Sequence, residues 1–187
     1  MIIAGLIVLS GCHTVVPVKQ SEPLASPARV SEPPLMEKKT NKETRPKHRV
    51  TEIADSATPS AKKVLLTGHR MAIVDKQVVR GSCWDYADAI YNKAGFFNTR
   101  KNRITVFKSK KHRGPYASAA MIQPGDWLYY INHAYRDIEH SAIFIRWVNK
   151  KKMQAKMLSY VGGNRREPAG YSTYDLSNVY QIIRAKP

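Results

Sequence analysis

The 187-residue chain has few cysteines, few acidic side chains and no long apolar run. Two cysteines cannot build a disulfide scaffold, so a small protein held together by several disulfide bonds is excluded. No run of about 18 apolar residues occurs, which excludes a protein with several transmembrane helices. Only 14 Asp and Glu stand against 31 Lys and Arg, and the net charge of +17 indicates an anionic partner such as nucleic acid, anionic lipid or a cell-wall polymer. The length suits one domain with a single core, or two very small ones.

The first eleven residues are uncharged, and their short apolar stretch ends at Leu9-Ser10-Gly11-Cys12. Such a stretch before small residues is typical of a secretory signal peptide. With a cysteine at its end it resembles a bacterial lipobox, which implies that residues 1–11 are removed and that Cys12 carries lipid. His13, in place of Asp, favours the outer membrane. We therefore expect a lipid-anchored protein that faces the periplasm, the alternative being an apolar start with a buried cysteine.

Residues 12–63 form a segment without aromatic side chains that holds seven of the eleven prolines. Sequence of this kind cannot bury enough apolar surface to offset the entropy lost on ordering. It predicts an extended linker after the lipidated cysteine, the alternative being an arm packed on the domain. The folded domain is then expected over residues 64–187, which carry a net charge of +13.

The apolar patterns of residues 64–187 predict helices first and antiparallel strands afterwards. Ser82 and Asp85 form a capping-box pattern, and Gly95 follows the last apolar position of that helix. A Pro-Gly pair at residues 124–125 predicts a type II turn before a strand. The predicted helices cover residues 64–79 and 82–94, and the predicted strands cover residues 104–107, 127–131, 140–148, 153–161 and 179–183. This order is typical of an α+β domain.

Cys83 is the only other thiol in the chain if Cys12 carries lipid. It lies one residue after the predicted cap Ser82, where free N–H groups and the helix dipole stabilise a thiolate. The same N–H groups can stabilise the oxyanion of an acyl-transfer reaction. The alternative is a small buried side chain on the helix face. The position favours a nucleophile.

A thiolate nucleophile needs a base, and His140 is the best placed of the six histidines. It begins the apolar strand His140-Ser141-Ala142-Ile143-Phe144-Ile145, so a rigid sheet is expected to hold its ring at the edge of the core. The other five stand in the linker, in a basic loop or alone in their segments: His13, His48, His112, His69 and His133. The last two remain alternatives. Cys83 and His140 together form a credible catalytic dyad.

Three motifs occur in a fixed order: Gly81-Ser82-Cys83-Trp84-Asp85-Tyr86, then Pro124-Gly125-Asp126-Trp127, then His140-Ser141-Ala142-Ile143. Together they resemble the NlpC and CHAP families of cell-wall cysteine hydrolases, which share a reduced papain-like fold and cleave amide bonds in peptidoglycan. The resemblance covers residues 64–184. It implies that Cys83 is the nucleophile and His140 the general base.

The resemblance implies a third residue that orients the imidazole, and two positions compete for this role. Ser159 stands where an NlpC-type strand would place it, and Asn164 resembles the residue at the end of the CHAP strand. We prefer Asn164, because its amide oxygen accepts a hydrogen bond from a ring N–H better than a short hydroxyl reaches. The chain departs from the usual NlpC pattern around Cys83, where Asp precedes the cysteine and a small residue follows it. Three aromatic residues are expected to bind substrate: Trp84, Tyr86 and Tyr116.

The function predicted is hydrolysis of an amide or peptide bond in the peptidoglycan stem peptide, with peptidoglycan and the membrane as partners. Basic loops at residues 108–113 and 150–152 would raise local association with carboxylates or anionic headgroups. No nucleic-acid recognition motif and no metal-binding pattern occurs, so neither nucleic acid nor a cofactor is expected. The alternatives are a non-catalytic peptidoglycan-binding lipoprotein and a cysteine hydrolase of another acyl substrate. For Trp84, the alternative to binding substrate is packing in the core.

Overall fold

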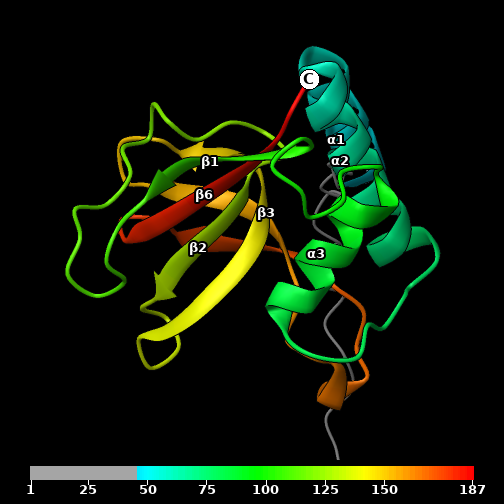
Figure 1. Ribbon diagram of the computed structural model, residues 1–187. Coiled ribbons are helices and arrows are strands. Elements are labelled where there is room, and N and C mark those ends of the chain that lie inside the picture. Colours follow the sequence, from blue (N-terminus) through cyan, green and yellow to red (C-terminus); the bar gives the residue numbers. More distant parts are fainter. Residues whose placement is uncertain (1–45) are drawn as a thin grey trace, which may run out of the picture. The chain divides into compact units, whose positions relative to one another are not determined.

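The computed structural model describes residues 46–187, apart from the side chains of residues 46–49 and 165. The predicted signal peptide, Cys12 and most of the predicted linker lie outside the described residues. Helices come first and strands follow (Figure 1). The helices are α1 (Pro46–Ser56), α2 (Pro59–His69), the π-helical turn η1 (Arg70–Val74), α3 (Cys83–Lys93) and the 3-10 turn η2 (Gly163–Arg165). The strands are β1 (Arg103–Lys108), β2 (Trp127–Asn132), β3 (Ile138–Asn149), β4 (Gln154–Ser159), β5 (Gly170–Asp175) and β6 (Val179–Ala185).

These strands form one antiparallel sheet in the order β1-β6-β2-β3-β4-β5. Helices together with an antiparallel sheet confirm the predicted α+β class. β3 lies between β2 and β4, and its residues from Ser141 to Ile145 are all buried. The prediction of an interior strand at residues 140–148 is therefore confirmed. Within residues 46–187, no helix is long and apolar enough to cross a bilayer.

Alternate residues of β3 enter two separate core clusters. Ile143 and Ile145 join the buried side chains of α2 and α3 in the first cluster. Ala142 and Phe144 point the other way, into a second cluster built by the strands and the segment before β2. The body of α3 packs on β3, on the side of the first cluster (Figure 1). We call the side of Ile143 the helix face of the sheet and the side of Ala142 the opposite face.

The folded part begins earlier than predicted, because the expected boundary at Val64 falls inside α2. α1 and the first turn of α2 occupy residues that the sequence predicted to be linker, and the linker prediction is wrong for them. Val50 and Ala54 of α1 are 4% and 0% exposed and join the first core cluster. Thr58 caps α2, and Pro59 stands in the first turn, where its missing N–H removes no hydrogen bond.

The remaining elements agree with the predictions to different degrees. The helix at residues 82–94 and the strands at residues 104–107, 127–131 and 179–183 are confirmed as α3, β1, β2 and β6. The helix predicted over residues 64–79 begins earlier and ends as η1 at Val74. The strand predicted to reach Val161 ends at Ser159, because Gly162 has a φ of +113°. β5 was not predicted. Its residues are mostly polar or exposed, as expected of a strand at the edge of a sheet.

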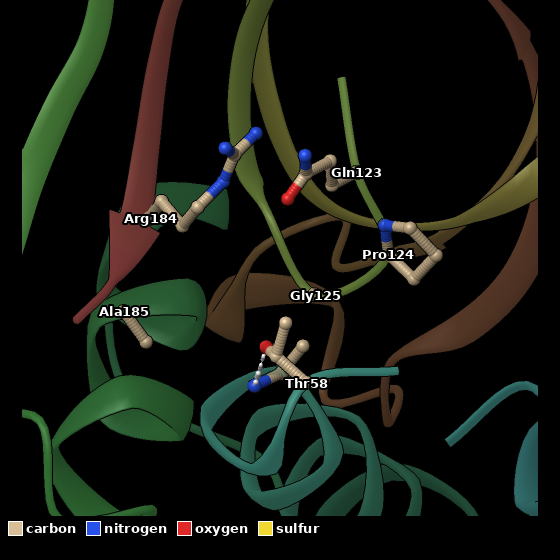
Figure 2. A pocket seen from close by; sticks show the side chains of 7 residues that line it. Thr58, Gln123, Pro124, Gly125, Arg184 and Ala185 are labelled. Atoms are coloured by element: carbon tan, nitrogen blue, oxygen red, sulfur yellow. Dashed lines mark hydrogen bonds between the residues drawn. The ribbon is translucent and has the colours of Figure 1, made fainter. Parts of the chain in front are cut away.

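The predicted Pro-Gly turn lies directly before β2, where Asp126 N donates to Gln123 O. Figure 2 shows this turn above the first turn of α2, close to Thr58. Gly125 has a φ of +86°, and a Cβ there would come within 3.0 Å of Ala61, so this position requires glycine. The turn is also fixed by Arg184, whose Nε and Nη2 donate to the two carboxylate oxygens of Asp126 at 2.7 Å each. The second motif of the sequence therefore serves to attach β2 to the helices.

Candidate active site

Cys83 is the first residue of α3, as the sequence predicted. The capping box before it is complete, since Trp84 N donates to Ser82 Oγ at 3.2 Å and Ser82 N donates to Asp85 Oδ2 at 2.7 Å. The hydrogen bonds from Ser82 N and Ser82 Oγ to Asp85 Oδ2 lower the pKa of Asp85, which therefore stays ionised at the N-terminus of the helix. The Cys83 side chain is a free thiol and is half-buried. Its own N–H is among the first of the helix, which have no intrahelical acceptor.

The chain segment before α3 is held at the end of β4. Tyr160, one residue past β4, donates through its hydroxyl to Val79 O at 2.6 Å and accepts from Val79 N at 3.2 Å. Gly163 N donates to Gly81 O at 2.7 Å. A Cβ at Gly163 would lie 2.6 Å from Val79 O, so only glycine allows the two backbones to approach this closely. The N-terminus of α3 is thereby placed near the end of β4 that carries Ser159.

His140 is the third residue of β3, and it pairs with Tyr130 of β2. Its Nε2 lies 2.8 Å from Ser159 Oγ, and the same oxygen lies 2.9 Å from the Tyr174 hydroxyl. Ser159 pairs with Ala142, so Ser159 and His140 share one face of the sheet. The ring centroids of Tyr130 and Tyr174 each lie 5.6 Å from that of His140. Nδ1 of His140 has no hydrogen-bond partner within residues 46–187.

Burial alone lowers the pKa of His140 to about 4. No carboxylate contacts the ring among the described residues, so nothing offsets the cost of burying its charged form. The imidazole is therefore neutral at neutral pH and can accept a proton. A neutral histidine with one nitrogen bound and the other open is suited to general base chemistry.

Cys83 and His140 lie near the same end of the sheet but are not joined by a hydrogen bond, because α3 packs on the helix face whereas His140, like Ala142, projects from the opposite face. The charge of Cys83 contributes to raising the pKa of Tyr129 and of Tyr130, after burial as the main cause in both. These two tyrosines are neighbours on β2 and point to different faces, since Tyr129 packs against the first cluster and Tyr130 belongs to the second. Tyr130 in turn packs edge-on against His140.

The structure places Ser159, and not Asn164, at the imidazole. Ser159 is 6% exposed and bonds to Nε2, whereas Asn164 lies in η2 with its side chain exposed and makes no hydrogen bond among the described residues. The preference for Asn164 is therefore wrong. The reason is that β4 ends at Ser159 and the chain then turns towards Gly81, so the residues after Val161 leave the sheet.

The three aromatic residues predicted to bind substrate lie in different surroundings. Trp84 is 42% exposed, and its ring lies over Trp127 with centroids 5.7 Å apart, so it is available next to Cys83. Tyr86 is 2% exposed and stacks on Tyr160 in the core, so its predicted contact with substrate is wrong. Tyr116 is half-buried in the segment between β1 and β2, one residue before Ala117 N donates to Val179 O.

The other described histidines have partners away from Cys83. His69 is 8% exposed and bonds through Nδ1 to the Tyr171 hydroxyl at 2.9 Å. His133 bonds to Asp137 and Asn178, which raise its pKa. His112 lies in the basic loop with Nε2 4.0 Å from Glu139. His140 is thus the histidine whose ring lies beside Ser159 and Tyr130.

Within residues 46–187, no group of three or more His, Cys, Asp or Glu side chains could hold a metal ion. What the site contains is a thiol at a helix N-terminus, a neutral imidazole and two hydroxyls. Sequence reasoning missed Tyr130 and Tyr174, because β5 gave no strand signal and nothing in the strand at residues 127–131 distinguishes Tyr130 from its neighbours. No family model matches the chain, and no curated protein or solved structure is significantly similar to it.

Proposed function

We propose that this protein is a lipid-anchored cysteine hydrolase that cleaves an amide or peptide bond in the peptidoglycan stem peptide. The observation that carries the proposal is the hydrogen bond between His140 Nε2 and Ser159 Oγ at the end of the sheet where α3 begins with Cys83. Nδ1 has no hydrogen-bond partner among the described residues, so we assign it the thiol proton. A nucleophile, a base and an orienting residue are the parts that covalent acyl transfer needs. The reduced papain-like arrangement implied by the three sequence motifs belongs to the same proposal.

The reaction would follow from the protonation states of the two residues. His140 is neutral and takes the thiol proton at Nδ1 while the sulfur attacks the scissile carbonyl carbon. The backbone N–H of Cys83 donates to the oxyanion of the tetrahedral intermediate. The imidazolium then gives its proton to the leaving amine as the C–N bond breaks, which leaves a thioester on Cys83. Water attacks the thioester with His140 as base, and the acid and the free thiol are released.

The proposed location depends on the N-terminal sequence, which supports export and lipidation of Cys12. A tethered protein with a net charge of +17 would stay close to carboxylate-bearing peptidoglycan and to anionic headgroups. Export would also separate it from nucleic acid, despite its positive charge.

Digestion of purified sacculi followed by mass spectrometry of the released fragments tests the proposal. We expect the wild-type protein to release muropeptides with one new amine and one new carboxylate, and Cys83→Ala to release none while it keeps its circular dichroism spectrum and melting temperature. Ser177→Ala, a change at an exposed position after β5, serves as the control and should act like wild type. Equal release by wild type and Cys83→Ala would overturn the assignment.

One observation favours a second candidate, a non-catalytic peptidoglycan-binding lipoprotein. The sulfur and the imidazole are not joined by a hydrogen bond among the described residues, as would suit a degenerate relative that has kept the surface but lost the chemistry. Alkylation of Cys83 by iodoacetamide at pH 6 separates the two candidates, because ordinary thiols react slowly there. Slow alkylation together with binding to sacculi would favour the binding protein. Fast alkylation that His140→Gln slows would favour the hydrolase, in which Cys83 and His140 act together.

A further inference from the structure

The basic loop at residues 108–113 lies at the same end of the sheet as Cys83 and His140. It leaves β1 at Lys108, which pairs with Gln181 of β6, and Ser109 N donates to Tyr180 O at 2.8 Å. β1 is three strands away from β3 in the sheet order, or about 14 Å at the usual spacing of strands. The loop therefore starts some distance from His140, but at the same level along the strands, because Lys108 is connected through Gln181 and Tyr129 to Ser141 by strand pairing.

The loop then returns across the ends of β6 and β2 to reach β3. It turns back where Gly114 N donates to Lys110 O at 3.0 Å. Lys111 Nζ lies 2.9 Å from Glu139 Oε1, and Glu139 directly precedes His140. Because side chains alternate along a strand, Glu139 projects to the helix face of the sheet. The loop therefore borders the face on which α3 lies.

Two tyrosines lie between the basic loop and Cys83. The rings of Tyr129 and Tyr180 have their centroids 6.1 Å apart, and the Tyr180 hydroxyl lies 3.5 Å from Glu139 Oε2. Trp84, the residue after Cys83, packs on Trp127 with ring centroids 5.7 Å apart, and Trp127 stacks on Tyr129 with centroids 5.3 Å apart. The start of α3 is therefore linked to one side of the tyrosine pair, and the basic loop meets the other side at Glu139.

The positive charge of the loop is largely unbalanced. Glu139 is the only acidic side chain that pairs with the loop among the described residues, and it pairs with Lys111 and, at 4.0 Å, with His112. Three more cations of the loop are exposed and form no ion pair within residues 46–187: Lys108, Lys110 and Arg113. Exposed, unpaired cations form a surface that suits a carboxylate.

We propose that the basic loop, beside Tyr129, is a subsite for substrate carboxylates on one side of the scissile bond, so that the substrate is an acidic peptide. This inference rests on the proposed function, because it takes Cys83 as the point where the bond is cleaved. The stem peptide of peptidoglycan carries carboxylates of the required kind. A neutral peptide of equal length lacks the groups that the loop would recognise.

The test compares two double variants that remove the same charge in different places, in full-length protein that also carries Cys83→Ala to prevent turnover. Lys110→Gln with Arg113→Gln changes the basic loop. Lys150→Gln with Lys151→Gln changes the turn after β3, which lies roughly 30 Å from His140 along that strand. The ligands are a fluorescent stem peptide with free carboxylates and the same peptide with its carboxylates amidated, each titrated by fluorescence polarisation.

We expect the loop variant to bind the acidic peptide about fivefold more weakly and the amidated peptide unchanged, and the turn variant to bind both peptides like its Cys83→Ala parent. An equal loss in the two variants would mean that net charge alone attracts the peptide, and no loss in the loop variant would mean that the loop does not bind it. Either result overturns the subsite. Hydrolysis of the peptide by wild-type protein is measured separately. Its absence, with the binding pattern intact, would refute the proposed function and leave a carboxylate-binding surface.

Discussion

The Nε2 atom of His140 lies 2.8 Å from the Oγ atom of Ser159, so a hydroxyl and not a carboxylate orients the imidazole. A hydroxyl can donate or accept a hydrogen bond, but it brings no negative charge to stabilise an imidazolium ion. Tyr174 extends the contact by a second neutral hydroxyl. The surroundings of His140 therefore stabilise its neutral form, which has consequences for pH dependence and for mutation.

The free energy of unfolding should decrease as the pH is lowered, because of His140. Burial lowers its pKa in the folded protein to about 4, whereas an unfolded histidine titrates near 6.5. The unfolded chain therefore binds this proton first, so the contribution is fully present above about pH 6.5 and is lost as the pH falls towards 4. We expect the free energy of unfolding in urea to drop by about 2 kcal/mol over this range, and His140→Gln to lose less. An equally steep drop in the variant would assign the effect to other groups.

For the proposed hydrolase, the same shift predicts how the rate of hydrolysis depends on pH. A base with its pKa near 4 remains neutral under mildly acidic conditions, so the acidic limb of kcat should lie near pH 4 and not near pH 6.5. The measurement is the initial rate of peptide hydrolysis between pH 3.5 and 8, on the stem peptide that sacculus digestion identifies. An acidic limb at pH 6 to 7 would contradict the neutral, buried state of His140.

Removing the hydroxyls beside His140 should slow the proposed reaction without unfolding the protein. Ser159→Ala deletes the contact to Nε2, and a lost hydrogen bond of about 1 kcal/mol corresponds to roughly a five- to tenfold lower kcat. Tyr174→Phe removes the next hydroxyl and keeps the ring against His140, so its effect on kcat should be smaller. Both variants should change the NMR titration of His140. Ser172→Ala, at an exposed position of β5, is the matched control.

The sequence predicted the elements that have strong local signals. Ser82 and Asp85 signalled the start of α3 correctly, because a capping box depends on residues three positions apart. The apolar run after His140 identified β3, because a strand buried on both faces has no polar interruption. Asn164 was preferred over Ser159 as the residue that orients the imidazole, because an amide oxygen accepts a hydrogen bond from a ring N–H well. The choice depended on where β4 ends, and the hydrogen bond between Gly163 and Gly81, which are 82 residues apart in the sequence, fixes that end.

Two further elements had signals too weak to recognise. α1 has a polar, proline-containing sequence, and it is helical because Val50 and Ala54 bury against the rest of the first cluster. β5 supplies Tyr174 to the site, yet its exposed, polar residues do not alternate in an obvious way. Both elements depend on tertiary contacts and not on local propensity. For this reason the composition of residues 46–63 led to a predicted domain boundary that is too late in the sequence.

The ion pair between Asp126 and Arg184 should be important for stability and not for chemistry. Asp126 is 1% exposed, and it accepts two hydrogen bonds from Arg184 and one from Gln123 N at 2.8 Å. Asp126→Asn leaves the guanidinium without its charge partner, and we expect a loss of about 3 kcal/mol in the free energy of unfolding. Asp137→Asn, at an exposed position, should cost far less. A loss below about 1 kcal/mol in Asp126→Asn would mean that the pair contributes no more than a surface ion pair.

Gly163 should control the position of Cys83 although it lies 80 residues later in the sequence. A Cβ at this position would lie 2.6 Å from Val79 O and 3.1 Å from Gly81 N, both backbone atoms that a side-chain rotation cannot move away. In Gly163→Ala the segment before α3 must therefore shift, which moves the first turn of the helix relative to His140.

Gly170→Ala is the matched control for this change, because its Cβ would meet nothing within 4 Å. We expect Gly163→Ala to lower kcat and the rate of Cys83 alkylation at least tenfold, since a displacement of about 1 Å can cost a hundredfold in rate. Its melting temperature should fall less than that of Asp126→Asn, because the affected loop lies outside the core clusters. Alkylation and turnover equal to those of Gly170→Ala would show that the contact between Gly163 and Gly81 does not position the thiol.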